Sequence, residues 1–329
     1  MDMCTSFTFS DETSDCFLAR TMDFSFELEG RPVFIPRNYS WEPKISRNRK
    51  TTYSFIGTGR KLTNYLVTDG VNEKGLAVAE LYFPNEAKYH AEMSKKKLNF
   101  CPHELIMWLL GEIANIEELK DRLSHVQLVE ETDPLLGLVL PLHFMVTDST
   151  GETIVIETNS GELEIKDNPI GVMTNSPEFE WHLKNLNNYL TIQPENISEP
   201  ELGNYQLRPF GNGAGTFGLP GGFTSPERFV RAAYLRNYTK YTKNSEESAN
   251  TLFHMLKSVS MTKGLSIKAD GSVSYTQYCA VFDVKNRRYY FSPYHTQEVF
   301  LLTLSNQLAM EKTAKEFDVS DSFVPTKLG

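Results

Sequence analysis

Cys4 lies so close to the start of the chain that a very short processing step would expose its own α-amino group. A thiol with an ordinary pKa of about 8.5 would then lie beside an amine with a pKa of about 8, and a proton could pass between them at little cost. An N-terminal amine is one of the bases that activate a side-chain nucleophile. Cys4 could therefore supply both nucleophile and base, although a small apolar residue at the start of an edge strand is the commoner role for such a cysteine.

The charge and the cysteine pattern exclude several classes of partner. The chain has 329 residues, with 42 acidic and 33 basic side chains and a formal net charge of -9. We therefore expect neither nucleic acid nor an anionic membrane as a partner, and an anionic substrate would need local arginines. No apolar run has the length of a membrane span, and the N-terminus lacks a signal-peptide core. The cysteines form no Cys-x-x-Cys pair, so we expect neither a zinc site nor a disulfide framework, and a reducing, cytoplasmic setting fits best. They are Cys4, Cys16, Cys101 and Cys279. The seven histidines show no metal-ligand spacing, and we expect no metal and no cofactor.

The first residues predict a hairpin that would position the chemistry. Residues 4–10 and 16–21 are rich in β-branched and aromatic side chains and flank a polar turn at 11–15. The second strand would bring Arg20 and Asp23 back toward Cys4. Further strands are predicted at residues 53–57, 65–68, 76–82, 142–147, 152–157, up to Met173, 274–282, 288–294 and 299–304.

Helical patterns separate these groups of strands. Apolar spacing and capping predict helices beginning near Pro102 and covering residues 116–123, about 178–190, 226–241 and 246–259. Hairpins, in place of regular strand–helix–strand alternation, predict mostly antiparallel sheets covered by helices, in a single domain over residues 1–329. Residues 191–225 read as a glycine-rich loop. No Gly-Lys-Ser/Thr follows it, so we expect a tightly turning loop on the substrate side in preference to a phosphate loop.

Four separated segments, taken in order, resemble the choloylglycine hydrolase family. They are Met3-Cys4-Thr5, Arg20-Thr21-Met22-Asp23-Phe24, Met173-Thr174-Asn175-Ser176-Pro177, and Gly218-Leu-Pro-Gly221 followed by residues 228–233. These cysteine N-terminal-nucleophile hydrolases include bile salt hydrolases and penicillin V acylases, and the similarity covers essentially the whole chain, including residues 69–76 and 275–278. The resemblance implies an α+β fold, a four-layer αββα sandwich with mostly antiparallel sheets, and a homotetramer.

The resemblance also implies a set of catalytic residues. Cys4 matches the nucleophile whose own amine acts as base, Asp23 the carboxylate that binds that amine, and Arg20 the arginine beside the thiol, where positive charge favours thiolate. Asn175 matches a donor to the oxyanion, joined by the backbone N–H of Tyr82.

Arg228 matches the second arginine of the pocket. Singly, Arg20 and Asp23 could form a surface ion pair. Asn175 could be a turn residue ahead of Pro177, and Arg228 a solvated helix charge, but the joint match favours the site. His182, near Asn175 in sequence, is the alternative base for a Cys/His arrangement.

The sequence departs from the family pattern in two places. Gly222 stands where family members often carry an acidic residue after Gly-Leu-Pro-Gly, so a loop contact is expected to be missing or remade. Residues 1–3 precede the nucleophile. We expect their removal, either as a short propeptide or, if Met3 is the true start, by trimming of that methionine.

The function expected from these residues is an amidase that removes an acyl group from a small N-acyl amide through a thioester on Cys4. Tyr82 favours penicillin V as substrate, because bile salt hydrolases commonly carry asparagine at this position. Conjugated bile salts and N-acyl homoserine lactones remain as alternatives with the same chemistry. From a different class, the chain could be a non-catalytic small-molecule-binding protein that retains the fold.

Overall fold

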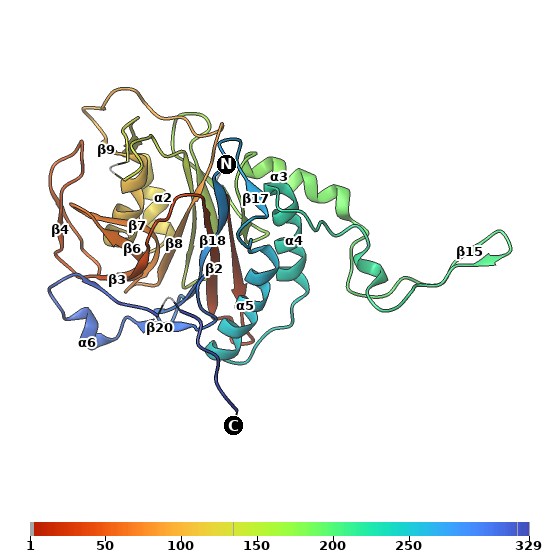
Figure 1. The fold of residues 1–329 in the computed structure, drawn as a ribbon. Coiled ribbons are helices and arrows are strands. Elements are labelled where there is room, and N and C mark those ends of the chain that lie inside the picture. Colours follow the sequence, from red (N-terminus) through yellow and green to blue (C-terminus); the bar gives the residue numbers. More distant parts are fainter. Residues whose placement is uncertain (1–2, 134, 321, 329) are drawn as a thin grey trace.

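Two stacked antiparallel sheets dominate the computed structural model, which describes residues 3–133, 135–320 and 322–328 (Figure 1). Residues 1–2 of the expected removable tripeptide lie outside this range. The sheet that carries Cys4 has the order β14-β1-β2-β18-β19-β20, with β17 paired to β18. Its strands are β1 (Met3–Ser10), β2 (Cys16–Phe24), β14 (Val172–Met173), β17 (Ser266–Ile267), β18 (Val273–Asp283), β19 (Arg288–Pro293) and β20 (Phe300–Thr303).

The second sheet has the order β13-β12-β11-β8-β7-β6-β3-β21. Its strands are β3 (Arg31–Ile35), β6 (Phe55–Lys61), β7 (Tyr65–Asn72), β8 (Leu76–Tyr82), β11 (Leu142–Asp148), β12 (Thr153–Glu157), β13 (Glu164–Asp167) and β21 (Lys315–Glu316). Short pairs join β4 (Ser40–Trp41) to β5 (Arg49–Lys50), β9 (Leu98–Phe100) to β10 (Val126–Leu128), and β15 (Glu201–Leu202) to β16 (Tyr205–Gln206).

Helices cover the outer face of each sheet and complete four layers (Figure 1). On the second sheet lie α1 (Leu105–Glu112), which packs on β7 and β8, and α2 (Ile116–Leu123), which packs on β11. On the first sheet lie α4 (Ser225–Tyr238) and α5 (Ser245–Val259), with α3 (Phe179–Asn185) beside α4. The chain therefore has the αββα sandwich that the resemblance implies. Short helices are η1 (Pro102–Glu104), η2 (Leu186–Tyr189), η3 (Ala214–Thr216) and α6 (Asn306–Ala309).

Strand β8 shows how the layers are filled. Because successive side chains of a strand point to opposite faces, Ala77, Ala79 and Leu81 enter the core between the sheets. Leu76 and Val78 join the other core, between the second sheet and α1. A strand that is buried on both faces reads as the near-continuous apolar run seen in the sequence.

The elements that were predicted from strong patterns have the predicted bounds, as β8 and α2 show. Strand β6 begins two residues later than expected, because the N–H groups of Thr52 and Tyr53 are donated to the Gly111 carbonyl outside the sheet. Strand β3 was not predicted, and Pro32 inside it is a residue that strand patterns disfavour. Among the described residues no helix has both the length and the apolar character that crossing a membrane requires.

The glycine-rich segment forms an arm that projects away from the body of the molecule and ends in the β15–β16 hairpin (Figure 1). We expected this segment to form a loop beside the substrate site. That expectation is wrong for most of the segment, because it projects away from the part of its own chain that contains Cys4. Only its end, at Phe223 and Ser225, contacts residues beside Cys4. Large apolar side chains on the arm are exposed to solvent, among them Leu202, Phe210 and Phe217.

Candidate active site

The hairpin of β1 and β2 brings the first three predicted site residues together. In its register Cys4 lies opposite Met22, Met3 opposite Asp23, and Ser6 opposite Arg20. Cys4 is only 2% exposed. Asp23 and Arg20 are fully buried in the same sheet, so they are not the surface ion pair that their spacing alone could have produced.

Arg20 contacts the Cys4 sulfur directly. Its Nη2 lies 3.5 Å from Cys4 Sγ and also donates to the Glu80 backbone carbonyl at 3.3 Å. The other end of the guanidinium is held by an ion pair with Asp69 at 2.7 Å and a hydrogen bond to the Tyr278 hydroxyl at 2.9 Å. Because Asp69 balances the charge of Arg20, a positive group can be kept against the sulfur in a fully buried place.

Burial dominates the chemistry of the thiol. It raises the pKa of Cys4, and Arg20 opposes that rise only in part. The backbone N–H of Asp23 and the charge of Arg228 also favour the thiolate, while the Asp23 carboxylate disfavours it. The thiol is therefore protonated near neutral pH and needs a base to react.

Asn175 and Arg228 meet at the backbone of Cys4. Arg228 donates from Nη1 to the Cys4 carbonyl at 2.5 Å and from Nη2 to Asn175 Oδ1 at 2.6 Å. Since a guanidinium only donates, Oδ1 must face it, and this fixes the orientation of the Asn175 amide. Asn175 Nδ2 then donates to the Tyr82 carbonyl at 2.6 Å. The amide donor is thereby held next to Tyr82, the residue expected to share the oxyanion with it.

In this structure Cys4 N still belongs to the peptide bond with Met3, and it donates to Asn175 Oδ1 at 2.9 Å. The Asp23 carboxylate instead accepts hydrogen bonds from the hydroxyls of Thr21 at 3.1 Å and Thr276 at 2.5 Å. Burial raises the pKa of Asp23 to about 6, against the opposing charge of Arg228. A buried carboxyl with this pKa is poised to ionise when a cation such as a free α-amine forms beside it.

A narrow apolar cavity opens beside Cys4. Its volume is about 40 Å³, and Tyr82 and Glu80 line it together with Cys4. The Tyr82 ring contacts Phe24 edge-on, with 6.2 Å between the ring centroids. The remaining lining is apolar or a single hydroxyl: Met22, Phe24, Leu28, Leu66, Thr68, Leu81, Leu136, Leu140 and Leu142. Leu66 also lines a larger neighbouring cavity of about 270 Å³.

His182 does not act on the sulfur in this geometry. Its Nε2 donates to the Asn175 backbone carbonyl at 2.9 Å, and its ring stacks on Phe229. Burial lowers the pKa of His182 to about 4, so the ring is neutral. The structure therefore gives His182 the role of supporting the Asn175 loop, and the alternative Cys/His arrangement is not formed.

Gly222 has a local explanation. A Cβ at this position would overlap the Glu227 carboxylate, which caps α4 by accepting from Thr224. The expected acidic residue would therefore displace a capping group. The loop is held in a different way, because Arg231 donates to the carbonyls of Pro220 at 2.7 Å and Gly222 at 2.9 Å.

The structure brings all six predicted site residues into one network, and it adds residues to which no role had been assigned. Asp69 and Tyr278 position Arg20, and Thr276 positions Asp23. Asp69 and Tyr278 lie in segments that already carried the family resemblance, so the signal was present without an assigned partner. The Glu80 contribution is a backbone carbonyl that accepts from Arg20 Nη2, which no pattern of side chains in the sequence could indicate.

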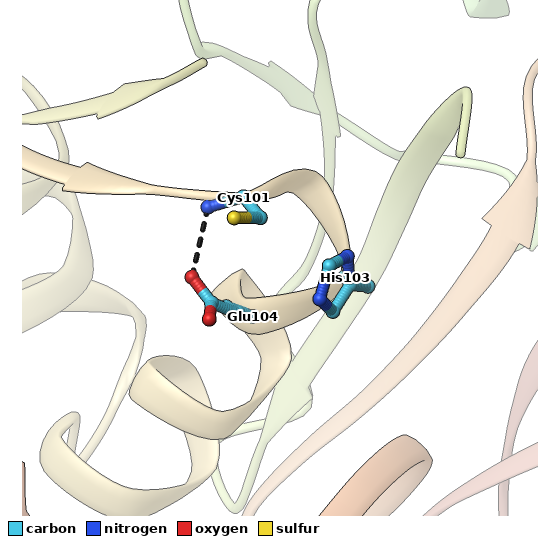
Figure 2. Close-up of side chains that lie close together, drawn as sticks. All are labelled: Cys101, His103 and Glu104. Atoms are coloured by element: carbon cyan, nitrogen blue, oxygen red, sulfur yellow. Dashed lines mark hydrogen bonds between the residues drawn. The ribbon is translucent and has the colours of Figure 1, made fainter. Parts of the chain in front are cut away.

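Away from Cys4, Cys101, His103 and Glu104 lie close together, with potential ligand atoms within 4.8 Å of one another (Figure 2). Glu104 is the third helical residue of a capping box whose N-cap is Cys101: its two carboxylate oxygens accept the backbone N–H groups of Cys101 at 2.9 Å and Lys44 at 2.7 Å. A carboxylate that is occupied in this way is a structural cap. The cluster fits a metal poorly.

Comparisons with known proteins agree with this geometry. The family model described as linear amide C–N hydrolases of the choloylglycine hydrolase family matches residues 4–321. A bile salt hydrolase/transferase of Clostridium perfringens is 33% identical over 93% of each chain. A crystal structure of a mutant conjugated bile acid hydrolase from Clostridium perfringens superposes with a TM-score of 0.91 at 29% identity, over 99% of this chain and 100% of the other. A penicillin V acylase of Pectobacterium atrosepticum is 25% identical over 92% of this chain and 81% of its own.

Proposed function

The chain belongs to the choloylglycine hydrolase family of linear amide C–N hydrolases, and on that premise we propose that it hydrolyses conjugated bile salts through a thioester on Cys4. The observation that carries the mechanism is the buried Cys4 sulfur held against Arg20, with Asn175 and Arg228 around the Cys4 backbone. Removal of residues 1–3 would free the α-amine that serves as base.

The reaction then divides into two balanced halves. In acylation the amine takes the thiol proton, the Cys4 sulfur forms a bond to the carbonyl carbon, and the protonated amine gives its proton to the leaving nitrogen as the C–N bond breaks. In deacylation the amine takes a proton from water as the water oxygen bonds to the thioester carbon, and the protonated amine returns that proton to the sulfur as the C–S bond breaks, which releases the acid and restores the thiol and the free amine. The Asn175 amide, with the Tyr82 backbone, stabilises the oxyanion in both halves. Asp23 stabilises the charged form of the amine between the transfers.

Similarity to known enzymes supports bile salts over penicillin V. The hydrolase from Clostridium perfringens shares more identity with this chain, over more of its own length, than the penicillin V acylase does. The expectation of penicillin V as the main substrate is therefore less well supported than its bile salt alternative. An apolar cavity beside Cys4 suits the acyl part of such a substrate, and a bulky acyl group would continue past Leu66 toward the larger cavity.

Penicillin V remains as a second candidate because of Tyr82. Tyr82 lines the cavity beside Cys4, and its ring makes an edge contact with Phe24, which lines the same cavity. The phenoxy ring of a phenoxyacetyl group could pack against the rings of Tyr82 and Phe24. Such a contact between rings would add about 0.5–1.5 kcal/mol to the binding free energy beyond the contribution of the buried area.

A parallel assay separates the two candidates. We expect the parent enzyme to hydrolyse glycocholate with a higher kcat/KM than penicillin V, and Tyr82→Asn to widen that ratio by about tenfold. Tyr238→Asn, at a half-exposed position on α4, is the matched control and leaves the ratio unchanged. A parent enzyme that prefers penicillin V would replace the first candidate by the second. Failure to hydrolyse either amide would contradict both.

Two further properties belong to this proposal. We propose a homotetramer, for which the exposed apolar side chains of the arm provide an unpartnered surface. We also propose a cytoplasmic setting, because Cys4, Cys16, Cys101 and Cys279 are all unpaired, as expected in a reducing compartment.

A further inference from the structure

A second apolar cavity, larger than the one beside Cys4, lies on the helix-covered face of the second sheet. Its volume is about 270 Å³, and most of its wall is apolar. Three residues of that wall, Trp41, Tyr65 and Met107, belong to the core between the second sheet and α1. Leu66 lines both cavities, but the six predicted site residues are not among the described residues that line the larger one. The larger cavity is therefore a candidate site of its own.

The alternation of side chains along β7 separates the two cavities. Tyr65 and Val67 belong to the core between the second sheet and α1. Successive side chains of a strand point to opposite faces, so Leu66 and Thr68 belong to the other face. There the Thr68 hydroxyl is hydrogen-bonded to the Tyr278 hydroxyl of the first sheet at 2.8 Å. Leu66 marks the boundary, so a molecule in the larger cavity would be a neighbour of the acyl group beside Cys4 and would not replace it.

The size of the larger cavity indicates what it can hold. Protein interiors pack with few voids larger than a water molecule, so packing alone does not account for a cavity of about 270 Å³. An apolar cavity of about 150 Å³ is large enough to bind benzene. The larger cavity therefore admits one or two fused rings. Trp41 and Tyr65 contribute aromatic side chains to its wall, and a flat ring can pack against them.

His103 brings a polar ring to this cavity. It lies in η1, is 7% exposed and lines the cavity. Its Nδ1 is buried without a hydrogen-bond partner among the described residues and faces the buried Asp133 carboxylate, with 3.8 Å between Nδ1 and Oδ2. Asp133 is held in place by its Oδ1, which accepts the backbone N–H groups of Leu135 at 2.9 Å and Leu136 at 2.8 Å. Because Nδ1 is the buried nitrogen, Nε2 is the one that remains for a ligand.

Burial makes Nε2 a hydrogen-bond acceptor. It lowers the pKa of His103, against the opposing charge of Asp133, so the ring is neutral near pH 7. A neutral imidazole carries its proton on one nitrogen only, and the carboxylate beside Nδ1 favours the proton there. Nε2 then has no hydrogen of its own, and a ligand must donate one to it.

The charged residues at the cavity favour a neutral ligand. Lys44 is ion-paired with Glu131 at 2.7 Å. Both carboxylate oxygens of Glu104 accept backbone N–H groups of the capping box and its neighbour. Glu42, which is exposed, accepts from Asn48 Nδ2 at 3.3 Å. A ligand ion would have to break one of these contacts, whereas a neutral ring with one hydrogen-bond donor would leave them intact.

We propose that the larger cavity is a second binding site, separate from the active site, for a neutral phenol whose ring fills the apolar space and whose hydroxyl donates to Nε2 of His103. A phenolic hydroxyl has a pKa of about 10, so it is neutral near pH 7. It is also a stronger donor than the hydroxyl of an aliphatic alcohol, and its flat ring matches a wall that contains Trp41 and Tyr65. This inference goes beyond the proposed function and does not depend on it.

A matched pair of ligands tests the hydrogen bond. Calorimetric titration of the parent enzyme with 2-naphthol should show one site, and 2-methoxynaphthalene, which has the same rings but no donor, should bind about tenfold more weakly. His103→Phe keeps a flat ring and removes the acceptor, so it should weaken binding of 2-naphthol about tenfold and leave binding of the methyl ether unchanged. Equal affinity of the parent for the two ligands, or undiminished binding of 2-naphthol by His103→Phe, would overturn the proposal.

A second variant tests the location. Leu62 is half-buried in the wall of the cavity, so Leu62→Trp should fill part of the space and weaken binding of both ligands about tenfold or more. Leu301→Trp, at an exposed position on β20, is the matched control and should leave both affinities unchanged. Unchanged binding by Leu62→Trp would place the ligand elsewhere and contradict the proposal.

The parent comparison of 2-naphthol with its methyl ether needs no substitution, so it decides the proposal even if a variant fails to fold. None of these measurements uses hydrolysis of an amide. Failure of the proposed function and failure of this inference are therefore seen in different experiments.

Discussion

Asp23 is the residue that links the buried hairpin to the pH at which the enzyme can work. Two hydroxyls hold its carboxylate in place, and burial raises its pKa to about 6. The resemblance of the segment Arg20-Thr21-Met22-Asp23-Phe24 to the family identified the residue. It could not indicate Thr276, which is brought opposite Asp23 by the pairing of β18 with β2. Contacts between distant strands depend on a register that a single segment does not contain.

At the scale of this residue we expect the pH dependence of kcat/KM to show a loss of activity on the acidic side. Asp23 must be ionised to stabilise the protonated amine, so kcat/KM should fall as the pH drops through a midpoint of about 6 or below, because a mature ammonium group lowers the pKa of Asp23 further. Asp23→Asn should lower kcat by about a hundredfold and remove this limb.

A pH–rate profile of parent and Asp23→Asn, with the melting temperature followed over the same pH range, provides the test. An acidic limb that persists unchanged in Asp23→Asn would assign it to another group.

At the scale of elements, the close approach of β6 and β7 positions Arg20. In this register Gly57 lies opposite Gly70, and Thr58 opposite Asp69. A Cβ on Gly57 would overlap the Asp69 backbone carbonyl. The order of the strands could not be predicted from the local pattern. The two glycines are visible in the sequence, but only the pairing of β6 with β7 shows why glycine is needed there, namely that the two backbones come into close contact.

Gly57→Ala should therefore lower the free energy of unfolding by about 2–3 kcal/mol and also weaken activity, because it moves the strand that carries Asp69. Gly221→Ala is the matched control, since a Cβ there meets open space at an ordinary backbone angle. Urea denaturation and turnover on the same samples measure both effects. If Gly57→Ala and Gly221→Ala had the same free energy of unfolding, β6 and β7 could move apart without loss of stability, and the argument from their close contact would be contradicted.

The sequence predicted long, strongly patterned elements well and the weakly patterned ones poorly. Strand β8 alternates between two apolar faces and was located correctly, whereas the polar edge strand β13 was missed. The glycine-rich segment was recognised as irregular but was assigned to the wrong place, since no local pattern states whether a loop folds back or projects.

At the scale of the whole molecule, the arm is the feature that a single chain leaves unexplained. It extends from the body and exposes Phe210, Phe217 and Leu202 to solvent (Figure 1). Apolar side chains gathered on a projecting segment are typical of a surface that a second copy covers.

We expect Phe210→Glu combined with Leu202→Glu to reduce the oligomer to smaller species, with the melting temperature of the separated chains within a few degrees of the parent value. Met93→Glu, at an exposed apolar position outside the arm, is the control. Light scattering coupled to size exclusion measures the mass. A parent protein that is already a monomer, or an unchanged oligomer in the arm variant, would contradict the proposed homotetramer.

The central claim is that the amide is cleaved through a thioester on Cys4, and intact-mass spectrometry of enzyme quenched in acid during turnover of glycocholate tests it most directly. The account predicts a chain that begins at Cys4, a fraction of which carries the mass of the cholyl group, located by digestion on the N-terminal peptide. Cys4→Ser should show neither the adduct nor turnover while keeping its circular dichroism. Turnover by a chain that retains Met1, or an acyl group on any residue other than Cys4, would contradict the mechanism.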